Sequence, residues 1–147
     1  MAKSNCCWQP VSQPVCASAA LLVLRLIVGA AFIFHGWGKI QHPFGWMPPQ
    51  APVHIPGVFQ FLAAVSEFGG GIALILGLFM PVAAFGLLFT MSVAVYMHMI
   101  VGKDPFVNPM GGMSYEPALV YWGIFLLFLA LGPGNFSLDN KIFGKRK

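Results

Sequence analysis

Two ionisable side chains fall deep inside apolar stretches of the chain, where an unpaired charge is costly. Arg25 lies in the stretch RLIVGAAFIFHGWGK, and Glu67 lies about ten residues into the next apolar stretch. An unpaired arginine in hydrocarbon costs at least ~3 kcal/mol, so each group needs a partner. When the depth of each residue is counted from the end of its helix at ~1.5 Å per residue, the axial gap between Arg25 and Glu67 is short enough for a long arginine side chain to bridge. We therefore predict that Arg25 and Glu67 form an intramembrane polar pair, which either fixes helix register or handles a proton or ligand.

The helix that carries Arg25 should turn one polar stripe toward the protein interior. At about 100° per residue, its stripe contains Arg25, Gly29, Phe32, Gly36 and Lys39, with His35 at the edge. On the second apolar stretch, small residues share the face of Glu67, so another helix can approach closely.

A second polar group is expected near the outer ends of the helices. Its members are His35, Lys39, His98 and Glu116. Such a group can hydrogen-bond the carbonyls of a quinone and pass protons to water, or it can anchor helix ends at the interface. Ligation of a haem by His35 and His98 is a further alternative. A metal site needs three or four converging ligands, so we predict none.

The composition is that of a membrane protein. Of the 147 residues, 58% are hydrophobic and 8% are charged, about a third of the charged fraction usual in soluble domains. Apolar stretches near the ~20 residues that cross a bilayer occur at 17–39, 57–79, 82–101 and 117–132. These stretches predict an all-α, polytopic, left-handed bundle of four transmembrane helices in one domain.

The ends of the chain indicate its orientation. Residues 1–16 are expected to form a cytoplasmic tail, and 141–147 a basic cytoplasmic tail whose charges contact anionic lipid of the inner (plasma) membrane rather than nucleic acid. The first apolar stretch is too long for a cleaved signal peptide and should stay in the protein. The three cysteines, Cys6, Cys7 and Cys16, fit neither a C-x-x-C nor a zinc pattern and receive no role.

Several motifs occur in a characteristic order between residues 22 and 140. They are Arg25 with Gly29 and Phe32, HGWGK at 35–39, SEFGGGIALILGLFMPVAA at 66–84, His98, Glu116, and GPGNFSLDN at 132–140. Because of these motifs, the segment 17–140 resembles the DoxX family of small four-helix membrane proteins. The family includes subunits similar to those of an archaeal thiosulfate:quinone oxidoreductase and of a mycobacterial membrane oxidoreductase complex.

The resemblance implies an accessory or quinone-interacting subunit of a membrane redox complex, docked to a redox partner protein or to further copies of itself. No cofactor motif is visible in the chain, and a quinone is the cofactor that the resemblance makes possible. Two other classes of function stay open. The chain can be a non-catalytic scaffold or assembly protein, or it can provide a pathway for protons or a small solute along its polar stripe.

Overall fold

The computed structural model describes residues 13–144, and several of its helix ends lie at proline or glycine, such as Pro14 before α1, Pro56 before α2 and Gly77 after α2. The elements are α1 (Val15–Gln41), α2 (Gly57–Leu76), α3 (Met80–Tyr96), the π-helical turn η1 (Met97–Val101), α4 (Glu116–Leu131) and α5 (Leu138–Phe143). Within this part of the chain all regular secondary structure is helical, which confirms the predicted all-α class. The predicted tail residues 1–12 and 145–147, with Cys6 and Cys7, lie outside the described residues, and Cys16 is exposed near the start of α1.

Three helices are long and apolar enough to cross a membrane: α1, α2, and α3 continued by η1. Their bounds agree with the expected stretches 17–39, 57–79 and 82–101 to within a few residues. Helix α4 is apolar but has 16 residues. At ~1.5 Å per residue it spans ~24 Å, less than the ~30 Å hydrocarbon thickness. The fourth crossing therefore stays a prediction.

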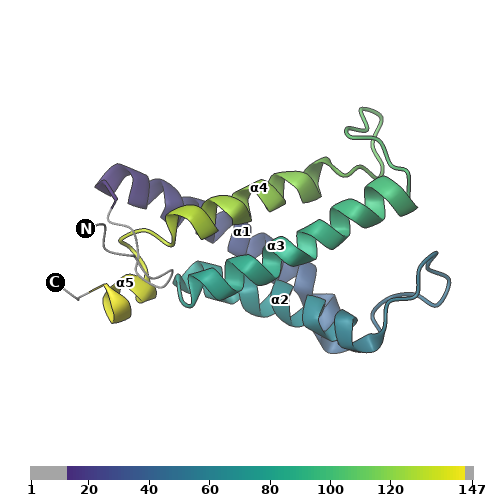
Figure 1. Ribbon diagram of the computed structural model, residues 1–147, viewed down its shortest axis with the longest axis horizontal. Helices are drawn as coiled ribbons and strands as arrows, with labels where there is room; N and C mark the ends of the chain where they lie inside the picture. Colours follow the sequence, from purple (N-terminus) through teal and green to yellow (C-terminus); the bar gives the residue numbers. More distant parts are fainter. Residues whose placement is uncertain (1–12, 145–147) are drawn as a thin grey trace, which may run out of the picture.

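The four long helices run roughly along the same axis (Figure 1). The two long connections, residues 42–56 and 102–115, lie at one end, and α5 lies at the other end beside the turn between α2 and α3. Helix α2 packs against both α1 and α3, and α4 packs against α3. We call the end with the long connections the outer end and the end with α5 the inner end.

Helices α1 and α2 approach so closely that glycine is required at their crossing. A Cβ on Gly29 would lie 2.7 Å from the carbonyl oxygen of Gly71. One on Gly36 would lie 2.5 Å from the backbone nitrogen of Phe68. These contacts fix the register of the two helices. Gly29, in the middle of α1, faces Gly71, and Gly36, about two turns nearer the outer end, faces Phe68.

Aromatic rings connect α1 to α4 across the apolar core. The ring of Phe32 meets those of Tyr121 and Phe125 edge-on, with centroids 5.0 Å apart in each case. Edge-to-face contacts of this kind add to the stabilisation from burial. The buried apolar side chains include Leu21, Val28, Phe32, Leu74, Met80, Leu87, Phe125 and Phe128.

At the inner end, the C-terminal segment folds back onto the turn between α2 and α3. Gly77 ends α2 with a φ of 62°, and its carbonyl accepts a hydrogen bond from the backbone N–H of Asp139 at 2.9 Å. The carboxylate of Asp139 accepts hydrogen bonds from the N–H groups of Phe79 and Met80, each at 2.8 Å. Ser137 caps α5, whereas the side chain of Asp139, which lies in the first turn of α5, caps the start of α3.

Candidate functional site

The carboxylate of Glu67 is buried between α1 and α2 and is held by a lysine. Lys39 Nζ lies 2.6 Å from Glu67 Oε1 and 2.7 Å from Oε2. The side chain of Glu67 is 3% exposed, whereas that of Lys39 is 27% exposed. The pair therefore consists of a buried anion and a cation that is still reachable from outside. Breaking such a pair from one side would leave an uncompensated buried charge.

A loop residue and a glutamine organise the space beside this pair. The ring of Trp46 lies over Lys39, with Nζ 4.6 Å from its centroid, a distance at which a cation is attracted to the aromatic face. Trp46 Nε1 donates to the backbone carbonyl of Gln60 at 2.9 Å. The Gln60 side chain accepts from the Met47 N–H at 3.0 Å and donates to the Ile55 carbonyl at 2.8 Å. One buried glutamine thus fixes both arms of the 42–56 connection.

The predicted pair of Arg25 and Glu67 is wrong. Arg25 is buried, but its guanidinium donates to three backbone carbonyls at the inner end: Pro133 at 2.5 Å, Phe136 at 2.9 Å and Ile75 at 3.4 Å. A guanidinium has five N–H donors in a fixed fork and can serve several carbonyls at once. Arg25 therefore holds the C-terminal segment against α1 and α2.

The helix register explains why the predicted pair does not form. Gly36 faces Phe68, the neighbour of Glu67, and lies 11 residues beyond Arg25 on α1. At ~1.5 Å per residue that separation is ~16 Å along the helix axis, too far for a side chain to span. The predicted stripe itself is confirmed: Arg25, Gly29, Phe32 and Gly36 are buried, and Lys39 is half-buried.

The four residues expected near the outer end do not form one hydrogen-bonded group. Lys39 pairs with Glu67, whereas His98 Nδ1 lies 2.8 Å from Asp104 Oδ2. His35 is exposed on α1 and contacts the ring of Phe32, with centroids 5.7 Å apart. Glu116 is half-buried at the start of α4, and its backbone N–H donates to Phe106. Among residues 13–144, no hydrogen bond or ion pair joins His98 or Glu116 to His35 or Lys39.

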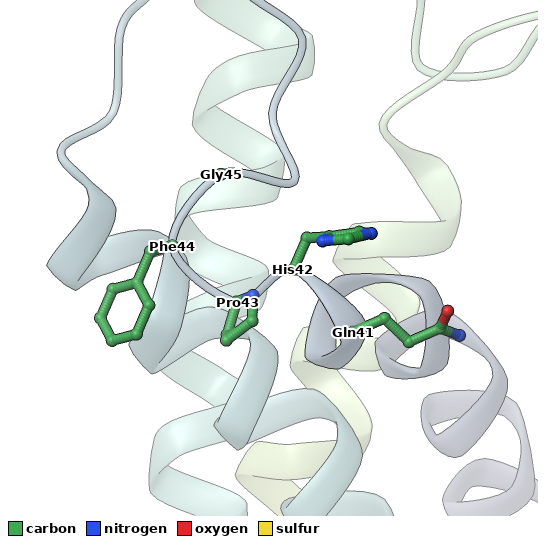
Figure 2. A pocket seen from close by; sticks show the side chains of 5 residues that line it. All are labelled: Gln41, His42, Pro43, Phe44 and Gly45. Atoms are coloured by element: carbon green, nitrogen blue, oxygen red, sulfur yellow. The ribbon is translucent and has the colours of Figure 1, made fainter.

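A hollow of about 490 Å³ lies just beyond Lys39, where α1 passes into the first long connection. Its lining is the single segment 41–45, and it is open to the outside. Figure 2 shows His42 and Gln41 directed to one side of this segment and Phe44 to the other. Phe44 stacks on Phe61 of α2, with ring centroids 5.0 Å apart. The hollow is an open approach to the outer end of α1, not an enclosed binding cavity.

Sequence reasoning missed the partners that complete these sites. Nothing in residue type or spacing connects Trp46 and Gln60 with the pair of Lys39 and Glu67. The six-residue interval between His98 and Asp104 gave a local signal, because a turn after a helix end brings such residues together. The carbonyl partners of Arg25 have no sequence signature, since every residue carries a carbonyl group.

The fold and the site define a class of protein: a small helical membrane protein in which a partly exposed lysine holds a buried glutamate toward the outer end. The DoxX family model matches residues 20–99, more than half of the chain. The chain belongs to the DoxX family.

Three curated bacterial proteins are similar to this chain over most of its length. An uncharacterized protein of Haemophilus influenzae is 37% identical over 85% of this chain and 92% of its own length. The inner membrane protein YqjF of Escherichia coli K12 is 32% identical over 81% of this chain and 88% of its own. "Putative oxidoreductase CatD" of Bacillus subtilis 168 is 29% identical over 79% of this chain and 87% of its own. No solved structure matches the chain.

Proposed function

We propose that this chain is a quinone-interacting membrane subunit of a redox system, and that the pair of Lys39 and Glu67 contacts the quinone headgroup. The observation that carries the proposal is the unequal exposure of the pair. Glu67 is 3% exposed and Lys39 27% exposed, so an ammonium group anchored by a buried carboxylate stays within reach of a ligand. A quinone carbonyl is an acceptor that such an ammonium can serve.

The chemistry of quinone reduction matches what these two groups supply. A quinone that gains two electrons also takes up two protons, one on each carbonyl oxygen. Lys39 donates a hydrogen bond to the oxygen on which charge develops, and the carboxylate of Glu67 accepts and releases protons between turnovers. The electrons come from a redox partner protein or from the substrate of that partner.

Family and location support the proposal. The E. coli relative of this DoxX-family chain is named an inner membrane protein, and quinones dissolve in that membrane. The name of the Bacillus subtilis relative assigns redox chemistry to that protein. We further propose that the chain lies in the inner membrane, with the start of α1 and the helix α5 on the cytoplasmic side.

A second candidate function is a non-catalytic scaffold for a membrane complex. It is favoured by the fact that Lys39 already binds both oxygens of Glu67, so the pair can act as a bond between α1 and α2 alone. Buried ion pairs are often neutral in net stability and can instead fix helix register.

Tryptophan fluorescence can separate the two candidates, because Trp46 lies over Lys39. A variant with Trp46 as its sole tryptophan is placed in lipid nanodiscs and titrated with a short-chain ubiquinone and a short-chain menaquinone. We expect saturable quenching by at least one quinone. Lys39→Met should weaken that binding about tenfold or more, since a hydrogen bond from a charged donor is worth ~1.5–3 kcal/mol.

The matched control is Lys141→Met, which removes a lysine from the exposed end of α5. This variant should bind quinone like the parent. Equal affinity in the parent and in Lys39→Met, with Lys39→Met folded but easier to unfold, would reject the quinone contact and favour the scaffold.

A further inference from the structure

The π-helical turn η1 brings an imidazole and a carboxylate together at the outer end of α3. His98 Nδ1 lies 2.8 Å from Asp104 Oδ2, and the backbone N–H of Asp104 donates to the carbonyl of His98 at 2.9 Å. Asp104 is therefore attached to His98 through both its side chain and its backbone. A Cβ on Gly102 would lie 2.8 Å from Asp104 Oδ2, so a larger residue there would push the carboxylate away from its present position beside His98. π-Helical turns of this kind are frequent at functional sites.

The contact with Asp104 determines which nitrogen of His98 carries the hydrogen. An ionised carboxylate is an acceptor only, so Nδ1 must donate to it. In the neutral imidazole, Nε2 then presents a lone pair and acts as an acceptor. Within residues 13–144 this Nε2 has no hydrogen-bond partner, and the side chain of His98 is 34% exposed. The result is an oriented acceptor that a ligand can reach.

The surroundings of His98 restrict the kind of ligand. Tyr96, Met99 and Ile100 are about half exposed along the same turn, as expected for side chains that face lipid. Polar residues of the outer connection begin at Lys103 and Asp104. A ligand at this boundary should combine an apolar body with a hydroxyl group at its polar end.

We propose that His98 Nε2 is the acceptor for a quinol hydroxyl at the outer membrane interface, with Asp104 as the residue that orients the imidazole. This inference rests on the proposed function, namely that the chain contacts the quinone pool. A quinol offers O–H donors, whereas the oxidised quinone offers carbonyl acceptors alone. In its neutral form, His98 held by Asp104 therefore binds the reduced form, and Lys39, a donor, binds the oxidised form.

The test compares quinol and quinone affinities of the full chain in nanodiscs, with a short-chain ubiquinone and its reduced form under anaerobic conditions. We expect His98→Leu to weaken quinol binding about three- to tenfold and to leave quinone binding unchanged, because one net hydrogen bond is worth about that factor. Asp104→Asn should weaken quinol binding less, since an amide oxygen can still accept from Nδ1–H, although the amide NH2 can also donate to Nδ1 of the other tautomer. His54→Leu, which removes an exposed histidine from the other connection, is the control and should match the parent.

The outcomes separate this inference from the proposed function. Unchanged quinol affinity in His98→Leu, together with weakened quinone affinity in Lys39→Met, would overturn the role of His98 alone. Failure of both ligands to bind the parent protein would overturn both proposals. Nitrogen-15 NMR of labelled histidine adds a readout that needs no variant to fold. We expect the parent His98 to carry its hydrogen on Nδ1, and a neutral Nε2–H tautomer would overturn the inference.

Discussion

At the scale of single residues, two of the buried charges of this protein, Arg25 and Glu67, are stabilised in different ways. Arg25 is surrounded by carbonyl oxygens of the inner end, whereas Glu67 is neutralised by one lysine from the outer end of α1. An arginine shared among carbonyls is a structural clamp. A carboxylate with one partly exposed partner can exchange that partner for a ligand, so the two residues are expected to respond differently to substitution.

Single and double substitutions of the ion pair should not be additive. Lys39→Met leaves the 3% exposed carboxylate without a partner and should lower the free energy of unfolding by about 3 kcal/mol. The double variant Lys39→Met/Glu67→Leu should recover to within about 1 kcal/mol of the parent, because no charge is left buried. Unfolding by SDS in mixed micelles measures both values. A double variant that loses the sum of the two single losses would show that the pair does not exist.

Replacement of Arg25 should weaken the attachment of the C-terminal segment. Arg25→Lys keeps the charge but loses the fork that reaches the carbonyls of Pro133 and Phe136. We expect a loss of about 2 kcal/mol in the free energy of unfolding for Arg25→Lys and more for Arg25→Met, which leaves those carbonyls without a donor. The same SDS titration measures these losses in the free energy of unfolding. Lys141→Met is the control, because it also removes a cation from the inner end. Parent-like stability of Arg25→Met would contradict the clamp.

Much of the fold could be predicted from the sequence, but the pairing of its charges could not. The helices follow from apolar runs bounded by proline and glycine, which are local properties. The partner of Glu67 depends on the axial register of α1 against α2, and hydropathy carries no information on register. Gly36 against Phe68 sets that register. Counting depths from the ends of each span was therefore enough to place Arg25 and Glu67 in the core, but not to pair them.

At the scale of elements, the α1–α2 crossing positions the candidate site. The close approach at Gly29 and Gly36 brings Lys39 level with Glu67, and Gln60 then fixes the connection that carries Trp46. A change in the crossing should therefore affect both stability and the fluorescence of Trp46.

Two glycines on the same helix provide a matched comparison. A Cβ on Gly36 would lie 2.5 Å from the backbone of Phe68, whereas one on Gly38 would meet no atom within 4 Å. Gly36→Ala should lower the free energy of unfolding by about 1–3 kcal/mol through overpacking. Gly38→Ala should leave it unchanged or raise it by up to about 1 kcal/mol, because alanine favours the helix. Equal effects of the two substitutions in the SDS titration would contradict the described crossing.

At the scale of the whole molecule, the bundle has one end with long connections and one end closed by α5. We predict that the end with the long connections faces away from the cytoplasm. Met110, at the tip of the second connection, is 98% exposed, and Cys16 is exposed near the start of α1. Each position can carry the sole cysteine of a variant.

A membrane-impermeant maleimide tests this orientation in intact cells. The Met110→Cys variant should react in intact cells, and the variant with Cys16 alone should react only after the cells are opened. The reverse pattern would place α5 on the side of the membrane away from the cytoplasm. The Lys39–Glu67 pair would then lie in the cytoplasmic half of the membrane.

Native mass spectrometry of the protein released from mild detergent tests the central claim most directly. The parent protein should carry a copurifying quinone, seen as an added mass and identified after dissociation. The Lys39→Met variant should lose most of that mass, and Lys141→Met should keep it. A parent protein that carries no quinone, even after incubation with short-chain ubiquinone and menaquinone, would contradict the proposal. An equal amount of bound quinone in the parent and in Lys39→Met would contradict it as well.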